Sequence, residues 1–207
     1  MTTNKTIYLI RHGQTDYNKQ GIIQGSGIDS DLNETGVQQA YAFYKQYKHV
    51  DFEQIYISEL KRTFQSVKPF VDAGFSHAVL PELNEINWGI YEGKKATYEF
   101  TQRYNEVVNS WRKGELHTPI EGGESPMEMF NRQKIGWQRI MEESHENVLI
   151  CMHGRAMRSF LSLILETPLS RMDDYDHSNL CLYKIEIKGK HKRLVEANNI
   201  KHLAGLR

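Results

Sequence analysis

The segment from residue 7 to residue 15, IYLIRHGQT, places a cation, an imidazole and a glycine directly after an apolar run. Such a run, β-rich and bounded by a glycine, predicts a strand that is covered on both faces. In open α/β sheets, ligands bind beyond the carboxyl ends of the strands. At that edge Arg11 offers a fork of donors that matches phosphate oxygens, His12 is a nucleophile near neutral pH, and Gly13 lets backbone and ligand approach closely. The segment therefore predicts a phosphate site.

A second segment supplies another guanidinium. Residues 55–57 predict a short strand, and Ser58 is predicted to cap the helix that follows. Arg62 then lies one turn into this helix, on the face near the cap, where it can reach the same anion. The alternative is a solvated surface arginine that pairs with Glu59 or Asp72.

A third segment, residues 83–93, embeds Glu85 and Glu92 among apolar and aromatic residues and glycines. Desolvation favours the protonated form of a carboxyl group, and a protonated carboxyl can donate its proton to a leaving alkoxide. Glu85 is therefore a candidate general acid. The alternative is a loop carboxylate that acts as a helix cap or an ion-pair partner.

A fourth segment repeats the first pattern. Residues 147–152 form an apolar run that ends in His153 and Gly154 and leads into an apolar-periodic helix over residues 156–165. The N-terminus of a helix directs unpaired N–H groups at the end of the strand, which favours an anion there. We expect His153 to share that place with the phosphate.

These segments need a scaffold that brings their strand ends together. The order of predicted elements is strand, helix, strand, helix, strand, a helical stretch, helix, strand, helix and two final strands. This alternation predicts a three-layer α/β/α sandwich with a mostly parallel sheet. Residues 183–190 and 193–197 predict an antiparallel pair at the sheet edge, with the turn near Gly189. We expect a single domain over residues 1–207, with residues 94–120 as a small helical cap insertion.

The ordered motifs together resemble the histidine phosphatase superfamily (branch 1), which includes cofactor-dependent phosphoglycerate mutases, fructose-2,6-bisphosphatases and α-ribazole phosphatases. The resemblance covers most of the chain. The matching positions are Arg11-His12-Gly13-Gln14-Thr15, Asn18, Gln24-Gly25, Leu32, Gly36, Ser58, Leu60, Arg62-Thr63, Glu85, Gly89, Glu92-Gly93, Gly123-Glu124-Ser125, His153-Gly154 and Arg158.

The resemblance implies a role for each of five residues. His12 attacks phosphorus and is transiently phosphorylated, and Glu85 protonates the leaving group and later deprotonates the attacking water. Arg11, Arg62 and His153 hold the phosphoryl oxygens. The resemblance also implies four substrate-binding positions, which are Asn18, Gln24, Ser58 and Gly154. It implies in addition a reaction on a small phosphomonoester that requires no metal and no cofactor.

Several positions depart from the family pattern. Asp31 replaces a proline, Asn33 replaces a threonine as the cap of the helix over residues 34–48, and Ser66 replaces a threonine. Asparagine is a good N-cap, so this change is tolerable. Arg155 stands where a small residue or asparagine is common, and its side chain can either enter the pocket or project into solvent.

Two other functions compete with a phosphatase. A mutase would keep the phosphohistidine and pass the phosphoryl group to another hydroxyl, and Trp111-Arg112-Lys113 is similar to the basic pair of mutases. Only nine residues separate Lys113 from Gly123, however, where mutases carry a longer insertion, and Ala96 replaces their usual lysine. A catalytically silent phospholigand-binding module would usually lack one of the five residues, and none is missing. We therefore favour the phosphatase.

Substrate choice is expected to reside in residues 94–120, which follow Glu85. The candidates for recognition of anions or flat groups are Lys94, Lys95, Tyr98, Arg103, Tyr104, Trp111, Arg112 and Lys113. The alternative is an amphipathic helix with a solvated charged face, in which Tyr104, Val108 and Trp111 form the packing stripe. For most of these residues the second interpretation is favoured.

Composition limits the partners and the cell compartment. Lys+Arg and Asp+Glu both total 26, so the net charge of zero argues against a nucleic-acid-binding surface. Cys151 and Cys181 lie in apolar runs and predict buried free thiols, and Met157 stands where a cysteine phosphatase needs its arginine. The start of the chain lacks an apolar signal segment and no run is long enough to span a bilayer, so we expect a cytoplasmic protein without membrane contact. The oligomeric state is left open, with a homodimer as one candidate.

Overall fold

A computed structural model describes residues 4–95 and 97–206, and residues 1–3, Ala96 and Arg207 lie outside the described part. Its centre is one six-stranded sheet with the strand order β3-β2-β4-β1-β5-β6. The strands are β1 (Asn4–Arg11), β2 (Gln54–Ile57), β3 (His77–Val79), β4 (Asn147–Met152), β5 (Leu182–Lys188) and β6 (His191–Asn199). The first four strands run parallel to one another, β5 is antiparallel to β1, and β6 is antiparallel to β5. The prediction of a mostly parallel sheet is confirmed.

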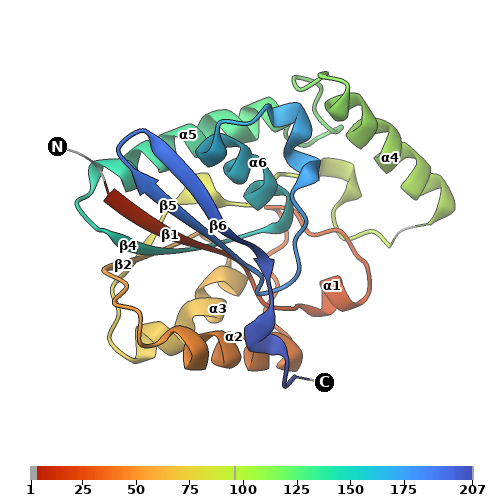
Figure 1. The fold of residues 1–207 in the computed structure, drawn as a ribbon. Coiled ribbons are helices and arrows are strands. Elements are labelled where there is room, and N and C mark those ends of the chain that lie inside the picture. Colours follow the sequence, from red (N-terminus) through yellow and green to blue (C-terminus); the bar gives the residue numbers. More distant parts are fainter. Residues whose placement is uncertain (1–3, 96, 207) are drawn as a thin grey trace.

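Helices cover both faces of the sheet (Figure 1). One face carries α2 (Glu34–Tyr47) and α3 (Lys61–Asp72), and the other carries α5 (Pro126–Glu142) and α6 (Gly154–Leu165). The remaining α-helices are α1 (Asp16–Lys19) and α4 (Tyr98–Arg112), and the short 3-10 helices are η1 (Pro81–Leu83), η2 (Gly89–Tyr91), η3 (Leu169–Asp174) and η4 (Lys201–Leu203). The predicted three-layer α/β/α arrangement is thus confirmed.

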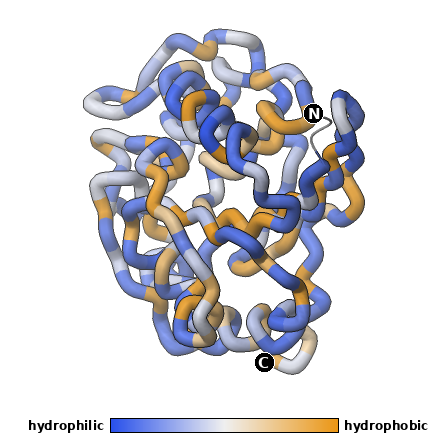
Figure 2. The backbone as a smooth tube through the Cα atoms, turned by 90° about the vertical axis from the view of Figure 1, so that its left-hand side faces the viewer, coloured by the Kyte–Doolittle hydropathy of each residue, from blue (hydrophilic) through white to orange (hydrophobic). Residues whose placement is uncertain are grey.

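The alternation of side chains along β1 explains why both faces need a helical layer. Ile7 and Leu9 pack into the apolar cluster formed with α5 and α6, whereas Tyr8 and Ile10 pack into the cluster formed with α2 and α3. Successive side chains of a strand point to opposite faces, so an apolar run makes both faces hydrophobic. Figure 2 shows the result, with hydrophobic residues concentrated along the strands in the middle of the molecule.

Two predicted helix starts have different outcomes. Asn33 caps α2 as predicted, because its side chain accepts a hydrogen bond from the N–H of Gly36 at 2.9 Å. Ser58 does not cap α3, so that prediction is wrong. The N-cap of α3 is Leu60, which has no capping side chain, and the Ser58 hydroxyl lies two residues earlier, where a buried histidine contacts it.

The C-terminal hairpin forms as predicted, with one correction. β5 and β6 pair in antiparallel fashion around Gly189, whose φ of +59° suits glycine. Of these two strands, however, β6 alone lies at an edge of the sheet, because β5 also pairs along its length with β1.

Among the described residues of the predicted cap insertion there is one helix, α4, which lies to the side of α5 and α6 away from the sheet (Figure 1). Trp111 of α4 is fully buried and stacks on Trp88 with ring centroids 5.9 Å apart. The packing stripe of Tyr104, Val108 and Trp111 therefore points inward, as the amphipathic-helix interpretation expected. No helix within residues 4–95 and 97–206 is long and apolar enough to cross a membrane.

Candidate active site

The two His-Gly motifs lie side by side because their strands are neighbours. Arg11 at the end of β1 is in register with Met152 at the end of β4, and the N–H of His12 donates to the carbonyl of Met152 at 2.9 Å. The rings of His12 and His153 consequently lie with their centroids 5.2 Å apart. Residues separated by 141 positions in the sequence thus meet at the carboxyl edge of the sheet, as the four motifs predicted.

A hydrogen bond to the backbone fixes the orientation and the tautomer of the His12 ring. Its Nδ1 lies 2.7 Å from the carbonyl oxygen of Gly13, and a carbonyl can only accept, so Nδ1 carries the proton. The lone pair of the neutral ring then resides on Nε2. Burial, followed by the charges of Arg62 and Arg11, lowers the pKa of His12 well below its usual value. The imidazole is therefore neutral at physiological pH and available for attack.

Arg62 is a buried arginine and not a surface arginine. Its side chain is 0% exposed, its Nε donates to Nδ1 of His153 at 3.2 Å, and its Nη atoms donate to the carbonyls of Ile28 at 2.6 Å and Gly25 at 3.2 Å. No carboxylate of the described chain forms an ion pair with it. Burial lowers the pKa of Arg62 to about 10, which keeps it charged near pH 7. The alternative of a pair with Glu59 or Asp72 is wrong.

His153 and Ser58 form a chain of hydrogen bonds behind His12. Since Arg62 donates to Nδ1 of His153, the proton of the neutral ring lies on Nε2, which donates to the Ser58 hydroxyl at 2.8 Å. That hydroxyl lies 3.0 Å from Oγ1 of Thr63, whose own proton goes to the carbonyl of Leu60 at 2.8 Å. Burial lowers the pKa of His153 well below its usual value. The chain fixes Arg62, and direct contact of His153 or Ser58 with the substrate stays a prediction.

Arg11 is the second guanidinium without a carboxylate partner among the described residues. It donates through Nη1 to Nδ1 of His177 at 3.2 Å, and its buried Nε has no partner. Burial, then the charges of Arg11, Arg158 and Arg155, lowers the pKa of His177 to about 3. His177 is thus a neutral acceptor that orients Arg11, and a buried cation in this state is suited to receive an anion.

Glu85 lies at the N-terminus of α6, with its side chain buried. One carboxylate oxygen accepts from the N–H of Ile86 at 2.9 Å and of Ala156 at 2.8 Å, and the other accepts from the N–H of Arg155 at 3.0 Å. Glu85 thus also serves as a cap for α6, which was the alternative interpretation of this residue. The capping bonds hold its carboxyl group on the wall of the pocket, and its protonation during a reaction stays a prediction.

The loop around Glu85 is fixed by residues of the other family motifs. Arg132 donates to the carbonyl of Glu85 at 3.1 Å and forms an ion pair with Glu124 at 2.7 Å. The backbones of Gly89 and Gly123 pass so close that a β-carbon on Gly89 would lie 2.6 Å from the N of Gly123. These contacts explain why glycines and a carboxylate occupy those motif positions.

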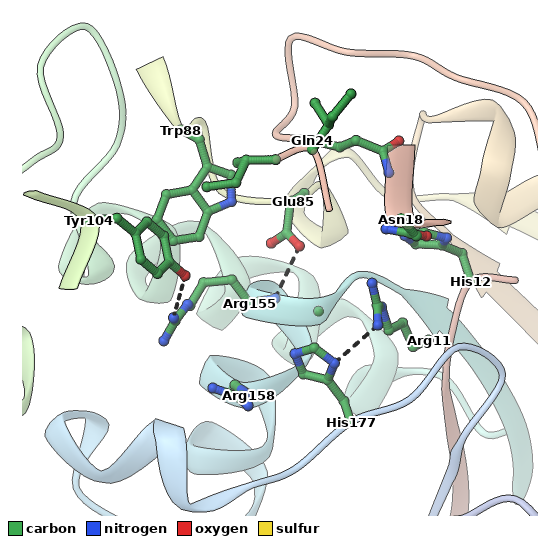
Figure 3. A pocket seen from close by; sticks show the side chains of 13 residues that line it. Arg11, His12, Asn18, Gln24, Glu85, Trp88, Tyr104, Arg155, Arg158 and His177 are labelled. Atoms are coloured by element: carbon green, nitrogen blue, oxygen red, sulfur yellow. Dashed lines mark hydrogen bonds between the residues drawn. The ribbon is translucent and has the colours of Figure 1, made fainter. Parts of the chain in front are cut away.

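The site opens into a cavity of about 310 Å³ (Figure 3). Among the predicted residues, Arg11, His12, Glu85, Asn18, Gln24 and Gly154 line it, whereas Arg62, His153 and Ser58 are buried and are not part of its lining. Seven further residues complete the lining, and they are Ile22, Ile23, Trp88, Tyr104, Arg155, Arg158 and His177. Of the eight recognition candidates between residues 94 and 113, only Tyr104 reaches this cavity.

Asn18 and Gln24 are held in place by their own hydrogen bonds. Oδ1 of Asn18 accepts from the N–H of Thr15 at 3.2 Å and from Nδ2 of Asn179 at 3.1 Å, whereas its Nδ2 has no partner in residues 4–95 and 97–206. Nε2 of Gln24 donates to the hydroxyl of Thr15 at 2.6 Å. Asn179 also donates to the carbonyl of His12 at 3.1 Å. The amide of Asn18 therefore has a donor to offer to a ligand.

Sequence reasoning left the position of Arg155 open and missed His177 and Trp88. Arg155 enters the cavity, where its guanidinium lies 5.5 Å from the ring of Trp88. His177 could have been found from its position two residues before Asn179, which contacts His12 and Asn18, in the segment just before the C-terminal hairpin. Trp88 belongs to the apolar core and also lines the cavity, and nothing in the local sequence indicated the second contact.

Two histidines and two unpaired arginines at the carboxyl edge of a parallel sheet form the type of site that binds and transfers a phosphoryl group. The chain matches the model of the histidine phosphatase superfamily (branch 1) over residues 7–200. It belongs to this superfamily, as its motifs indicated. The described residues contain no group of three or more His, Cys, Asp or Glu side chains that could hold a metal ion.

Proteins with different names are similar to this chain in sequence or in fold. A Hydrogenobacter thermophilus protein named "Putative phosphoserine phosphatase 2" is 27% identical over 199 residues, which cover 96% of this chain and 97% of the relative. An Erwinia tasmaniensis protein named "Probable phosphoglycerate mutase GpmB" is 33% identical over 168 residues, which cover 78% and 75% of the two chains. The structure of the α-ribazole phosphatase from Shigella flexneri is similar with a TM-score of 0.81 at 24% identity, over 94% of this chain and 96% of that one.

Proposed function

We propose that this protein is a phosphatase that hydrolyses a small phosphomonoester through a phosphohistidine intermediate on His12. The observation that supports it most is the pair of buried guanidinium groups, Arg11 and Arg62, that flank His12 without a carboxylate partner in the described chain. A phosphate dianion supplies the two negative charges that these cations lack. The cavity volume suits a small ester.

In the first step, Nε2 of His12 attacks phosphorus while the bond from phosphorus to the ester oxygen breaks. Neutral His12 needs no base for this attack, because its Nδ1 proton is held by the carbonyl of Gly13. Arg11 and Arg62 stabilise the charge on the equatorial oxygens, which is the main task in phosphoryl transfer. Glu85 donates its proton to the departing oxygen.

In the second step, water attacks phosphorus and the bond from phosphorus to Nε2 breaks. Glu85, now a carboxylate, accepts the proton of the attacking water. The N–H groups of Arg155 and Ala156 stabilise this carboxylate. His12, Glu85 and the two arginines Arg11 and Arg62 therefore serve both halves of the cycle, and inorganic phosphate leaves through the cavity.

A mutase activity is the second candidate, and the Erwinia relative supports it. A mutase would exclude water from the phosphohistidine and present a second hydroxyl of the substrate. The two activities differ in product. Phosphatase action releases inorganic phosphate, whereas mutase action converts 3-phosphoglycerate into 2-phosphoglycerate without net release.

The first experiment measures phosphate release from a panel of phosphomonoesters in excess chelator, for the wild type, His12→Ala and the exposed control His49→Ala. We expect release by the wild type and the control, loss of release in His12→Ala, and an acid-labile phosphoprotein after a rapid quench of the wild type. Binding of esters without turnover would indicate the silent binding module. Isomerisation without release would indicate the mutase.

A further inference from the structure

Two arginines of α6 line the cavity on the side away from His12 (Figure 3). Arg155 and Arg158 are three positions apart on the helix, so they lie on the same face of it. The mechanism described above uses neither side chain. Their presence in the cavity therefore requires another explanation.

Both arginines share one buried carboxylate, Asp173 of η3. Its side chain is 4% exposed, and it forms ion pairs with Nη1 of both Arg155 and Arg158. The same carboxylate also forms an ion pair with Arg112 at 3.3 Å. The side chain of Arg112 is 55% exposed, so water largely screens its charge. Burial alone would raise the pKa of Asp173, but the arginines hold it below its usual value. Asp173 is therefore charged, and it balances only one of the two cavity arginines.

With Glu85 in the protonated form that the proposed first step requires, the charges of the cavity divide into two parts. At the His12 end, Arg11 and Arg62 have two positive charges and match a phosphate dianion. At the other end, Arg155 and Arg158 exceed Asp173 by one positive charge. The buried Nε of Arg158 has no hydrogen-bond partner among residues 4–95 and 97–206. A single negative charge, and not a second dianion, completes this end.

Aromatic side chains hold Arg155 in position before any ligand arrives. Its guanidinium lies 5.5 Å from the Trp88 ring and 5.8 Å from the Trp111 ring, and its Nη2 donates to the hydroxyl of Tyr104 at 3.3 Å. A guanidinium placed on aromatic faces loses little conformational freedom on binding. Arg155 is therefore preorganised as an anion contact.

We propose that Arg155 and Arg158 form a second anion subsite, and that the substrate is a phosphomonoester that also has a carboxylate. This inference rests on the proposed function for the identity of the first anion. It assigns specificity to the start of α6 and to the facing residues Trp88 and Tyr104.

The test compares 3-phosphoglycerate with glycerol 3-phosphate, which differ in a carboxylate against a hydroxymethyl group. We expect kcat/KM to be about 10- to 100-fold higher for the acid, as a charge-assisted hydrogen bond provides. Arg158→Met should bring this ratio to within about threefold of one. The ratio is measured on one preparation, so a partly unfolded variant does not distort it. The control Arg171→Met removes an arginine that is 70% exposed and pairs with Asp174 next to Asp173.

The same pair of ligands is also tested for binding to the His12→Ala protein, which does not depend on turnover. A higher affinity for 3-phosphoglycerate that Arg158→Met abolishes would support the subsite even if no ester were hydrolysed. Equal kcat/KM and equal affinity for the two ligands would overturn it while phosphate release upheld the proposed function. A stronger preference for fructose 1,6-bisphosphate over 3-phosphoglycerate would overturn the assignment of a carboxylate.

Discussion

Gly154, the first residue of α6, is a sensitive point of the pocket, and its replacement by alanine tests the packing there. Its φ is not in the left-handed region, so alanine fits the backbone. A β-carbon, however, would lie 2.9 Å from Cε1 and 3.0 Å from Nε2 of His177. Contacts this short are repulsive, so the imidazole must move, and its movement breaks the 3.2 Å hydrogen bond to Arg11.

The magnitude follows from that hydrogen bond. A bond to a charged group contributes about 1.5–3 kcal/mol, so the loss of positioned Arg11 should lower kcat/KM about 10- to 100-fold. The free energy of unfolding should change little, because alanine is favoured over glycine in a helix by about 1 kcal/mol and this gain offsets part of the strain. Phosphate release and thermal unfolding of Gly154→Ala measure the two effects separately.

A double-mutant cycle with His177→Ala gives the decisive control. Without the imidazole, the nearest of the remaining atoms is Nε of Arg11 at 3.5 Å, which is an ordinary contact. In the His177→Ala background, the second change should therefore cost almost nothing, and the two losses should be strongly non-additive. Losses that add, or full activity in Gly154→Ala, would refute this reasoning.

Three further predictions concern the loop at Glu85, the His177 imidazole and the Cys151 thiol. Arg132→Met should lower kcat about tenfold with little change in KM, because it removes the hydrogen bond that holds the carbonyl of Glu85. Steady-state kinetics measure both constants, and an unchanged kcat would contradict the prediction. Since the pKa of His177 is lowered to about 3 in the folded protein, the unfolded chain takes up more protons as pH falls below about 6.5. His177 should therefore cost about 2 kcal/mol of stability between pH 7 and pH 5, and His177→Asn should reduce that loss in denaturant titrations at the two pH values. Burial raises the pKa of the Cys151 thiol, so iodoacetamide should leave the native enzyme active. Inactivation that follows alkylation of Cys151 would contradict this prediction.

The fold could be predicted from the sequence because the apolar runs of β1 and β4 are unambiguous and end in the same motif. A run such as residues 7–10 has to be covered on both faces, and the intervening helices are the only segments long enough to cover it. The error at Ser58 has a physical reason. Serine at the start of a helix can cap it, but α3 begins only at Lys61, and the Ser58 hydroxyl accepts from the N–H of Leu60 and from His153, a residue 95 positions later in the chain.

The chemical part of the site was more predictable than its recognition part. His12 and His153 directly follow strands and Arg62 begins a helix, so the convergence of these three residues could be inferred from the topology of the sheet. Glu85 lies in a loop, and the family motif indicated it. The position of Arg155 could not, because the angle between β4 and α6 decides which turn of the helix faces the cavity. The contact with Asp173 depends in addition on where the chain returns after α6.

This division suggests how substrate preference can change while the chemistry is kept. The groups proposed for phosphoryl transfer come from the end of β1, from α3 and from the loop of Glu85, and each of them is held by its own buried hydrogen bonds. The groups of the second subsite come from α6, α4 and η3, and Glu85 connects the two sets through the N–H groups of Arg155 and Ala156. Substitutions at Arg155 or Arg158 should therefore alter the ratio of activities between esters, whereas substitutions at Arg11 or Arg62 should lower activity toward all of them. Relatives with different substrates can in this way share one catalytic end and differ in the other.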